Sequence, residues 1–377
     1  MTLRGLAIAI IALLVVAAAG CGGDGGGGSV NVSTELVTEA EFPLALTFAP
    51  DGRIFFNERY KGDIRVIDVG GQLLREPFAT MDDLSASGAE WGLIGLTLDP
   101  EFESNGYVYA YYTEFVTDGP PKIAHPLIVR YTDEDNVGVD RTVLVDDLPE
   151  TDPEHDAGAH IGGNLRFGPD GFLYVSIGDM ESDADAGTTA SLRGTIVRLN
   201  AADGAAADGN PFPDDPRADP RVFAYGLRNP FEFTFQPDTG TLYAADNGPF
   251  KCDRLLRIEP GLNYHWPDLD AICEGQGATD PVYLFAMPGQ MGTDNNSNVG
   301  PAGLDFVTGD RYGDLTGALL ACEWNTGFMR QLVLSDDGAS VESDDIVVED
   351  CHLDVAVSPD GTVYYTNDSE IRRLVAE

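Results

Sequence analysis

Residues 160–179 read HIGGNLRFGPDGFLYVSIGD, and they contain the unit that decides the fold. Within them, residues 167–175 (FGPDGFLYV) form a short apolar run, a turn made of Pro and Asp-Gly, and a second, mainly apolar run. Proline presets the backbone at the start of such a turn, and glycine tolerates the left-handed conformation at its end. The stretch therefore predicts a strand, a tight turn and a second strand.

The same unit recurs along the chain. Clear copies are residues 48–56 (FAPDGRIFF), 235–243 (FQPDTGTLY) and 357–365 (VSPDGTVYY), and looser copies are residues 98–112 and 306–320. Spacings of roughly 50 to 70 residues, repeated six times, are typical of a β-propeller whose blades have four strands. Helical periodicity does not persist over any long stretch. We therefore predict an all-β fold, a six-bladed β-propeller, over residues 37–377.

The charge of the chain limits its partners. The sequence has 63 Asp and Glu against 22 Lys and Arg, for a net charge of −41. A field of this sign repels nucleic acid and anionic lipid, so no nucleic-acid partner is expected. An acidic, lysine-poor surface suits high salt, where charges are screened, although an ordinary acidic secreted protein is the alternative. The many carboxylates are oxygen ligands of the kind that Ca²⁺ prefers.

The N-terminus predicts export. Residues 6–19 are apolar but short for a membrane span, and AAGC at 18–21 resembles a lipobox in which Cys21 is lipidated. We expect a lipoprotein-type signal peptide at 1–21 and a Gly-rich tether at 22–36, with an uncut signal anchor as the alternative. The protein would then be a bacterial lipoprotein, periplasmic or on the outer cell surface, touching the membrane only through its lipid.

Four cysteines remain after Cys21, an even number that suits an oxidising compartment. They are Cys252, Cys273, Cys322 and Cys351. Three pairings are possible, and the pairs Cys252–Cys273 and Cys322–Cys351 close the shortest loops.

Three short motifs carry candidate chemistry. His160 stands before a strand among glycines and acidic residues, where an imidazole could take a proton from a hydroxyl group; a loop histidine bonded to backbone is the alternative. Arg228 and Asn229 precede a proline, which holds the asparagine extended, although a surface arginine would look the same. Gly248 and Pro249 expose carbonyl groups that suit Ca²⁺, or form a simple turn.

Taken together, these segments resemble the soluble quinoprotein glucose and aldose-sugar dehydrogenases, the glucose/sorbosone dehydrogenase propellers. The resemblance covers about residues 37–375. Its matching segments are 42–52 (FPLALTFAPDG), 90–96 (EWGLIGL), 99–109, 160–179, 226–230 (GLRNP), 246–249 (DNGP), 260–267 (PGLNYHWP) and 354–361 (DVAVSPDG).

The resemblance implies a function and residue roles. Members of the family use pyrroloquinoline quinone (PQQ) and Ca²⁺ to oxidise the C1 hydroxyl of aldoses to lactones, with hydride passing to the quinone. His160 would be the base, and Glu90, Arg228 and Asn229 would lie at the cofactor. Gly248 and Pro249 would bind Ca²⁺ through their carbonyls. The implied partners are a sugar and an external electron acceptor.

The chain also departs from the family. PQQ carries three carboxylates, which the family holds with a lysine in the fifth blade and two arginines in an Arg-x-Arg-Asp-Val stretch. Here that stretch is CHLDV at 351–355, and the last lysine is Lys251, so Asn325 or a neighbour stands in place of the lysine. Arg311 and Arg330 are the remaining candidates for the missing cations.

These departures leave two hypotheses open. One is a PQQ- and Ca²⁺-dependent aldose dehydrogenase. The other is a propeller lipoprotein without quinone, which binds carbohydrate or protein or acts as a Ca²⁺-dependent, lactonase-like hydrolase.

Overall fold

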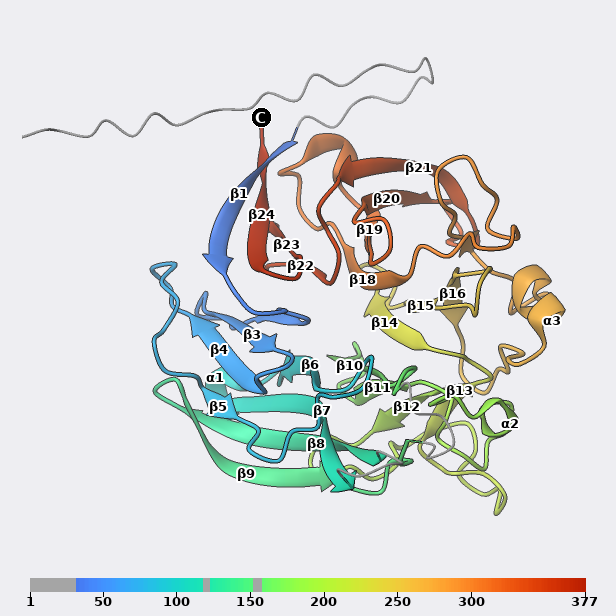
Figure 1. Ribbon diagram of the computed structural model, residues 1–377, viewed down its shortest axis with the longest axis horizontal. Helices are drawn as coiled ribbons and strands as arrows, with labels where there is room; N and C mark the ends of the chain where they lie inside the picture. The colour runs from blue at the N-terminus through green and yellow to red at the C-terminus, as the bar shows by residue number, and fades with distance from the viewer. Residues whose placement is uncertain (1–31, 118–122, 152–157) are drawn as a thin grey trace, which may run out of the picture.

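The computed structural model describes residues 32–117, 123–151 and 158–377, and it confirms the six-bladed β-propeller. Six antiparallel sheets of four strands surround a central axis (Figure 1). The first three complete blades are β2 (Leu46–Phe48), β3 (Ile54–Glu58), β4 (Asp63–Ile67) and β5 (Ala79–Thr80); β6 (Leu93–Leu98), β7 (Tyr107–Thr117), β8 (Ile123–Glu134) and β9 (Val137–Val145); and β10 (Gly162–Phe167), β11 (Leu173–Ile177), β12 (Thr195–Leu199) and β13 (Val222–Tyr225).

The next two blades and the closing blade follow in chain order. They are β14 (Pro230–Phe235), β15 (Leu242–Asp246), β16 (Arg254–Ile258) and β17 (Tyr283–Leu284); β18 (Pro301–Phe306), β19 (Leu319–Glu323), β20 (Met329–Leu334) and β21 (Val341–Val348); and β22 (Val355–Val357), β23 (Val363–Thr366) and β24 (Glu370–Ala376) with β1 (Val32–Glu39). The described helices are short: α1 (Phe102–Asn105), α2 (Asp183–Ala186), α3 (Leu269–Glu274) and a 3-10 turn at Gly313–Leu315. No helix of the described ranges is long and apolar enough to cross a membrane.

The two ends of the chain close the ring together. Strand β1 pairs with β24 from Val32 opposite Ala376 to Glu39 opposite Glu370, so the last blade takes its outermost strand from the N-terminus (Figure 1). The propeller therefore includes residues 32–36, which the sequence assigns to the tether. The sequence hides this strand because an outermost strand is exposed on much of its surface and needs few apolar residues. The predicted signal peptide, Cys21 and the first part of the tether lie outside the described residues.

The inner strands form the wall of the axis. Each first strand contacts the first strand of the next blade, and β22 returns to β2 to complete the circle. Close packing here requires glycine: a side chain on Gly95 in β6 would collide with the carbonyl of Gly163 in β10. Four inner strands, β6, β10, β14 and β18, show a register shift within their first residues. Such bulges re-aim side chains at the end of the sheet where the site lies.

The connections explain why distant residues meet. In a four-stranded antiparallel blade, the link into the inner strand and the hairpin between the second and third strands emerge at the same end. Six of each therefore gather on one face of the propeller, around the axis.

Both disulfides form between the cysteines that close the shortest loops. Cys252 is bonded to Cys273 and Cys322 to Cys351, with sequence separations of 21 and 29 residues.

Candidate functional site

One cavity of about 420 Å³ opens on this face, and it gathers all six site residues that the sequence predicts. They arrive from links into inner strands and from hairpins, and they are Glu90, His160, Arg228, Asn229, Gly248 and Pro249. The volume lies within the range of roughly 300–1,000 Å³ usual for small-molecule sites. The six residues therefore form one site.

His160 is held by a buried carboxylate. Its Nδ1 lies 2.7 Å from Oδ1 of Asp179, a residue with no exposed surface, and Oδ2 of Asp179 accepts a hydrogen bond of 2.8 Å from the indole of Trp266. The Glu181 amide also donates to Asp179, at 2.8 Å. An ionised carboxylate only accepts hydrogen bonds, so this contact favours the tautomer of the neutral imidazole that has its proton on Nδ1 and leaves Nε2 as the acceptor. This is the arrangement that a general base requires.

The backbone around His160 is strained. His160 itself has a φ of 58°, in the left-handed region that costs a non-glycine residue roughly 1 kcal/mol. Gly178 lies against the His160 carbonyl, where any side chain would collide. The surrounding structure enforces this conformation, as it often does where a side chain must be aimed.

Glu90 and Asn229 join two blades across the cavity. Asn229 Nδ2 lies 3.2 Å from both carboxylate oxygens of Glu90, and Glu90 also accepts a 3.0 Å bond from the Ile161 amide. The Asn229 side-chain oxygen accepts from the Gly162 amide at 3.2 Å. The residues beside His160 are thus tied to Asn229, which is itself buried.

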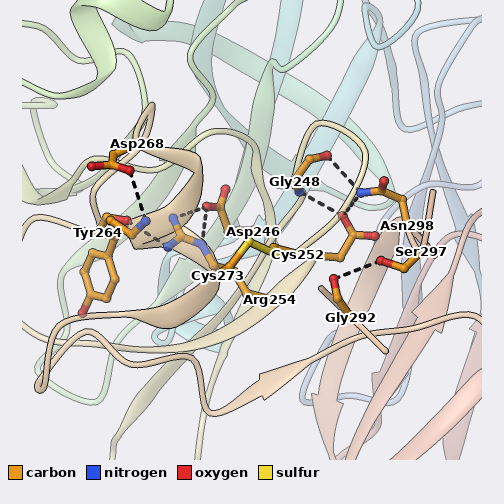
Figure 2. Close-up of a disulfide and its surroundings, with 12 residues drawn as sticks. Asp246, Gly248, Cys252, Arg254, Tyr264, Asp268, Cys273, Gly292, Ser297 and Asn298 are labelled. Atoms are coloured by element: carbon orange, nitrogen blue, oxygen red, sulfur yellow. Dashed lines mark hydrogen bonds and ion pairs between the residues drawn. A yellow bond between two sulfur atoms is a disulfide. The ribbon is translucent and has the colours of Figure 1, made fainter. Parts of the chain in front are cut away.

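A buried ion pair supports Arg228 and Asn229 from below. Asp246 Oδ1 accepts both of their backbone amides, at 3.0 and 2.8 Å, while its Oδ2 lies 2.7 Å from Nη2 of Arg254. The side chains of Asp246 and Arg254 are only 2% and 1% exposed. Figure 2 shows this pair beside the disulfide between Cys252 and Cys273.

The predicted calcium ligands form a tight corner. The carbonyl of Gly248 accepts from Arg228 Nη1 and from the Asn298 side chain, each at 3.1 Å, and the Gly248 amide donates to Asp253 (Figure 2 shows the Gly248–Asn298 contact). Asp253 also accepts from the Val299 and Gly300 amides, and burial raises the pKa of its carboxyl. Nearby, Asn247 Oδ1 is buried without a hydrogen-bond partner among the described residues.

Metal ligation here would use neutral oxygens. Within the described ranges, no group of three or more His, Cys, Asp or Glu side chains is arranged to hold a metal ion. The unpaired Asn247 Oδ1 is the observation that favours a cation at this corner, together with the main-chain oxygens beside it.

The suggested replacements for the missing cations are wrong. Neither arginine lines the cavity. Arg330 forms salt bridges of 2.6 Å with Glu323 and Asp344. Arg311 forms a salt bridge with Asp360 at the surface. Both have carboxylate partners nearby in the fold, which a sequence does not reveal. Asn325, by contrast, does line the cavity.

Sequence reasoning missed several contributors. Asp179 ends the predicted strand and has a buried partner, Trp266, 87 residues away, so only the fold joins them. Arg59 lines the cavity from the hairpin after β3, and Trp324 and Tyr60 form part of its wall. No local motif marks Arg59, Tyr60 or Trp324, whereas Asp179 and Trp266 lie within the segments 160–179 and 260–267. The Gly-Asp pair at the end of the stretch 160–179 was the one local signal that could have identified Asp179.

The comparison with known protein families agrees with this site. The family model for glucose/sorbosone dehydrogenase matches residues 40–376. The chain belongs to the glucose/sorbosone dehydrogenase family. The aldose sugar dehydrogenase YliI of Escherichia coli is 30% identical over 248 residues, which are 63% of this chain and 62% of that protein.

Solved structures show the same propeller. An oxidoreductase described as a glucose dehydrogenase from Thermus thermophilus superposes with a TM-score of 0.77 and 31% identity, covering 92% of this chain and all of that one. The PQQ-bound aldose sugar dehydrogenase of Streptomyces coelicolor gives a TM-score of 0.71 and 25% identity, over 92% of this chain and 99% of that one. The names of both solved structures describe sugar dehydrogenases, and one of these structures has PQQ bound.

Proposed function

We propose that the protein oxidises the C1 hydroxyl of an aldose to a lactone, with PQQ and Ca²⁺ bound in the cavity and His160 as the general base. The observation that carries the proposal is the pair of His160 with the buried Asp179, placed in the same cavity as Arg228 and Asn229. The family assignment and the names of the relatives support a sugar as substrate.

The lining of the cavity fits a planar anion rich in oxygen. Two guanidinium groups, those of Arg59 and Arg228, face it, and asparagine side chains add neutral donors. Trp324, 46% exposed, offers an aromatic face at the rim. Arg228 and Asn229 would hold the quinone oxygens, and one guanidinium remains for a carboxylate.

The quinone, when bound, supplies the two-electron acceptor that amino-acid side chains lack. The work of the protein is to remove a proton and to orient the sugar. Nε2 of His160 takes the proton of the C1 hydroxyl, so that the oxygen can form the carbonyl as the C1 hydrogen departs with its electron pair. Asp179 keeps the imidazole in the required tautomer and stabilises the imidazolium that forms.

Calcium would bind at the Gly248–Pro249 corner through main-chain carbonyls and Asn247 Oδ1. Arg228 Nη1 donates to the carbonyls of Asn247 and Gly248, at 2.9 and 3.1 Å, and a dication at this corner would compete with it for both oxygens. Binding of Ca²⁺ would therefore release Arg228 toward the quinone. On this account the cation and the quinone favour each other's binding.

We propose that the protein is an exported lipoprotein, attached through Cys21, that passes electrons to an external acceptor. The two disulfides are consistent with an oxidising compartment.

Reconstitution tests the proposed function. The purified protein, supplied with PQQ and Ca²⁺, is expected to reduce an artificial dye when an aldose is added, and chelation of the calcium should abolish this activity. Absence of bound quinone at micromolar concentration would overturn the proposal. The family scaffold would then serve binding or hydrolysis without a quinone.

A further inference from the structure

Arginine pairing sets Arg59 apart from the rest of the chain. Within the described ranges, every arginine forms a salt bridge with another described residue except Arg59, Arg130 and Arg228. With 63 acidic residues available, an arginine without a carboxylate partner is unusual here. Two of the three exceptions, Arg59 and Arg228, line the same cavity.

Arg59 is also buried and preorganised. It is only 6% exposed, and its Nε donates to the Trp91 carbonyl at 3.0 Å while Nη2 donates to that of Ala89. Its Nη1 makes no hydrogen bond with any residue that the structure describes. The guanidinium lies close to two aromatic rings, 5.2 Å from the centroid of Phe42 and 4.7 Å from that of Tyr60.

A buried guanidinium that has no carboxylate at salt-bridge distance is stabilised when an anion binds to it. Burial lowers the pKa of the Arg59 guanidinium, opposed by the charge of Glu90, which attracts it without reaching salt-bridge distance. Glu90 is itself bound by Asn229 and the Ile161 amide. Burying a charge costs desolvation free energy unless a group of opposite charge binds it. For Arg59 that group would be a ligand in the cavity.

Aromatic side chains line the cavity beside Arg59. Phe42 lies 4.9 Å from Tyr60 and 5.7 Å from Trp324, measured between ring centroids, with the ring planes tilted by 58° and 53°, so the three rings form an aromatic cluster. Tyr60 and Trp324 are 42% and 46% exposed, which is high for such large side chains. An aromatic acid could stack on one of these two exposed rings with a carboxylate at Arg59.

We propose that Arg59 binds a carboxylate of the ligand, doing in this chain what the lysine and the arginine pair do in the rest of the family. Taking PQQ as that ligand rests on the proposed function. On this proposal the anion is held in this chain from the first complete blade, by a residue on the hairpin between β3 and β4.

Equilibrium binding of PQQ tests this assignment without relying on turnover. The variant R59Q is expected to bind PQQ about 30-fold more weakly or worse, because it removes one partner of a buried charge pair. R59K keeps the charge but loses the planar fork, and should fall between R59Q and the wild type. The matched control is R130Q, another arginine without a salt bridge to a described residue, which is stacked on Tyr107 outside the cavity. It should bind like the wild type.

The outcomes separate the two proposals. Equal PQQ affinity of R59Q, R59K and the wild type overturns the role of Arg59 and leaves the proposed function standing. If the wild type binds no PQQ, the proposed function fails, and benzene-1,3,5-tricarboxylate becomes the probe. Binding of that probe to the wild type but not to a folded R59Q, with R130Q unaffected, supports the role of Arg59. Failure of the wild type to bind the probe overturns it.

Discussion

The buried pair of Asp246 and Arg254 should determine both the stability of the fourth complete blade and the placement of Arg228 and Asn229. In the variant R254M, Asp246 loses the two contacts of 2.7 and 3.1 Å to the guanidinium. Both side chains are almost fully buried, so the remaining carboxylate is left uncompensated in the interior. Removing one partner of such a pair costs about 3–5 kcal/mol in the free energy of unfolding.

Urea unfolding followed by circular dichroism measures this cost. The control is R257M on the same strand β16, whose salt bridge to Glu259 joins side chains that are 42% and 43% exposed and should contribute at most about 1 kcal/mol. The double variant D246N/R254M removes the uncompensated charge and keeps an oxygen for the Arg228 and Asn229 amides, so it should recover part of the loss. Equal unfolding free energies for R254M and R257M would refute the reasoning.

Three further predictions concern the base, the central channel and a disulfide. D179N leaves one acceptor oxygen for His160 and Trp266, so kcat/KM for the sugar should fall about 10- to 100-fold, the loss of a hydrogen bond to a charged group, with unchanged PQQ affinity. An unchanged kcat/KM would contradict the role of Asp179. Burial raises the pKa of Asp354, in the central channel near Arg166 and Asp305, to about 6. Because this lies above the unfolded value of about 3.9, the ionised carboxylate destabilises the fold above pH 6 and the penalty disappears below pH 4. D354N should therefore raise the free energy of unfolding at pH 8, by up to about 3 kcal/mol, and have little effect at pH 4; a loss of stability at pH 8 would show that the carboxylate itself is needed. The double variant C252S/C273S opens a loop of 21 residues and should lose about 3 kcal/mol in the same urea assay, whereas no loss would show that the unfolded chain gains little freedom.

The fold was predictable because each blade repeats a local signal. The Pro and Asp-Gly turn needs only adjacent residues, and six copies imply a closed ring. Strand β1 lacked such a signal, since its pairing partner is β24 at the other end of the chain. An outermost strand buries few side chains, so its sequence shows little of the apolar pattern that identifies a strand.

The residues of the candidate site were predictable only where a reactive side chain or carbonyl group lies near a turn that glycine or proline marks. His160 and Arg228 stand two residues from a glycine or proline on each side, and Gly248 precedes a proline; these residues mark the turns that carry the site. Arg59 and Trp266 acquire their roles through contacts between distant segments, which no local pattern reveals. The wrong suggestion of Arg330 has the same origin, because its partner Asp344 faces it from the neighbouring strand β21.

Sugar-driven reduction of the bound quinone tests the central claim most directly. An aldose is added without oxygen or dye to protein loaded with PQQ and Ca²⁺, and the absorbance of the oxidised quinone is followed in a single turnover. The account predicts a sugar-dependent loss of this absorbance in the wild type, and a rate at least about 100-fold lower in H160Q at equal quinone loading. A spectrum that does not respond to any aldose, or an equal rate in H160Q, would contradict it.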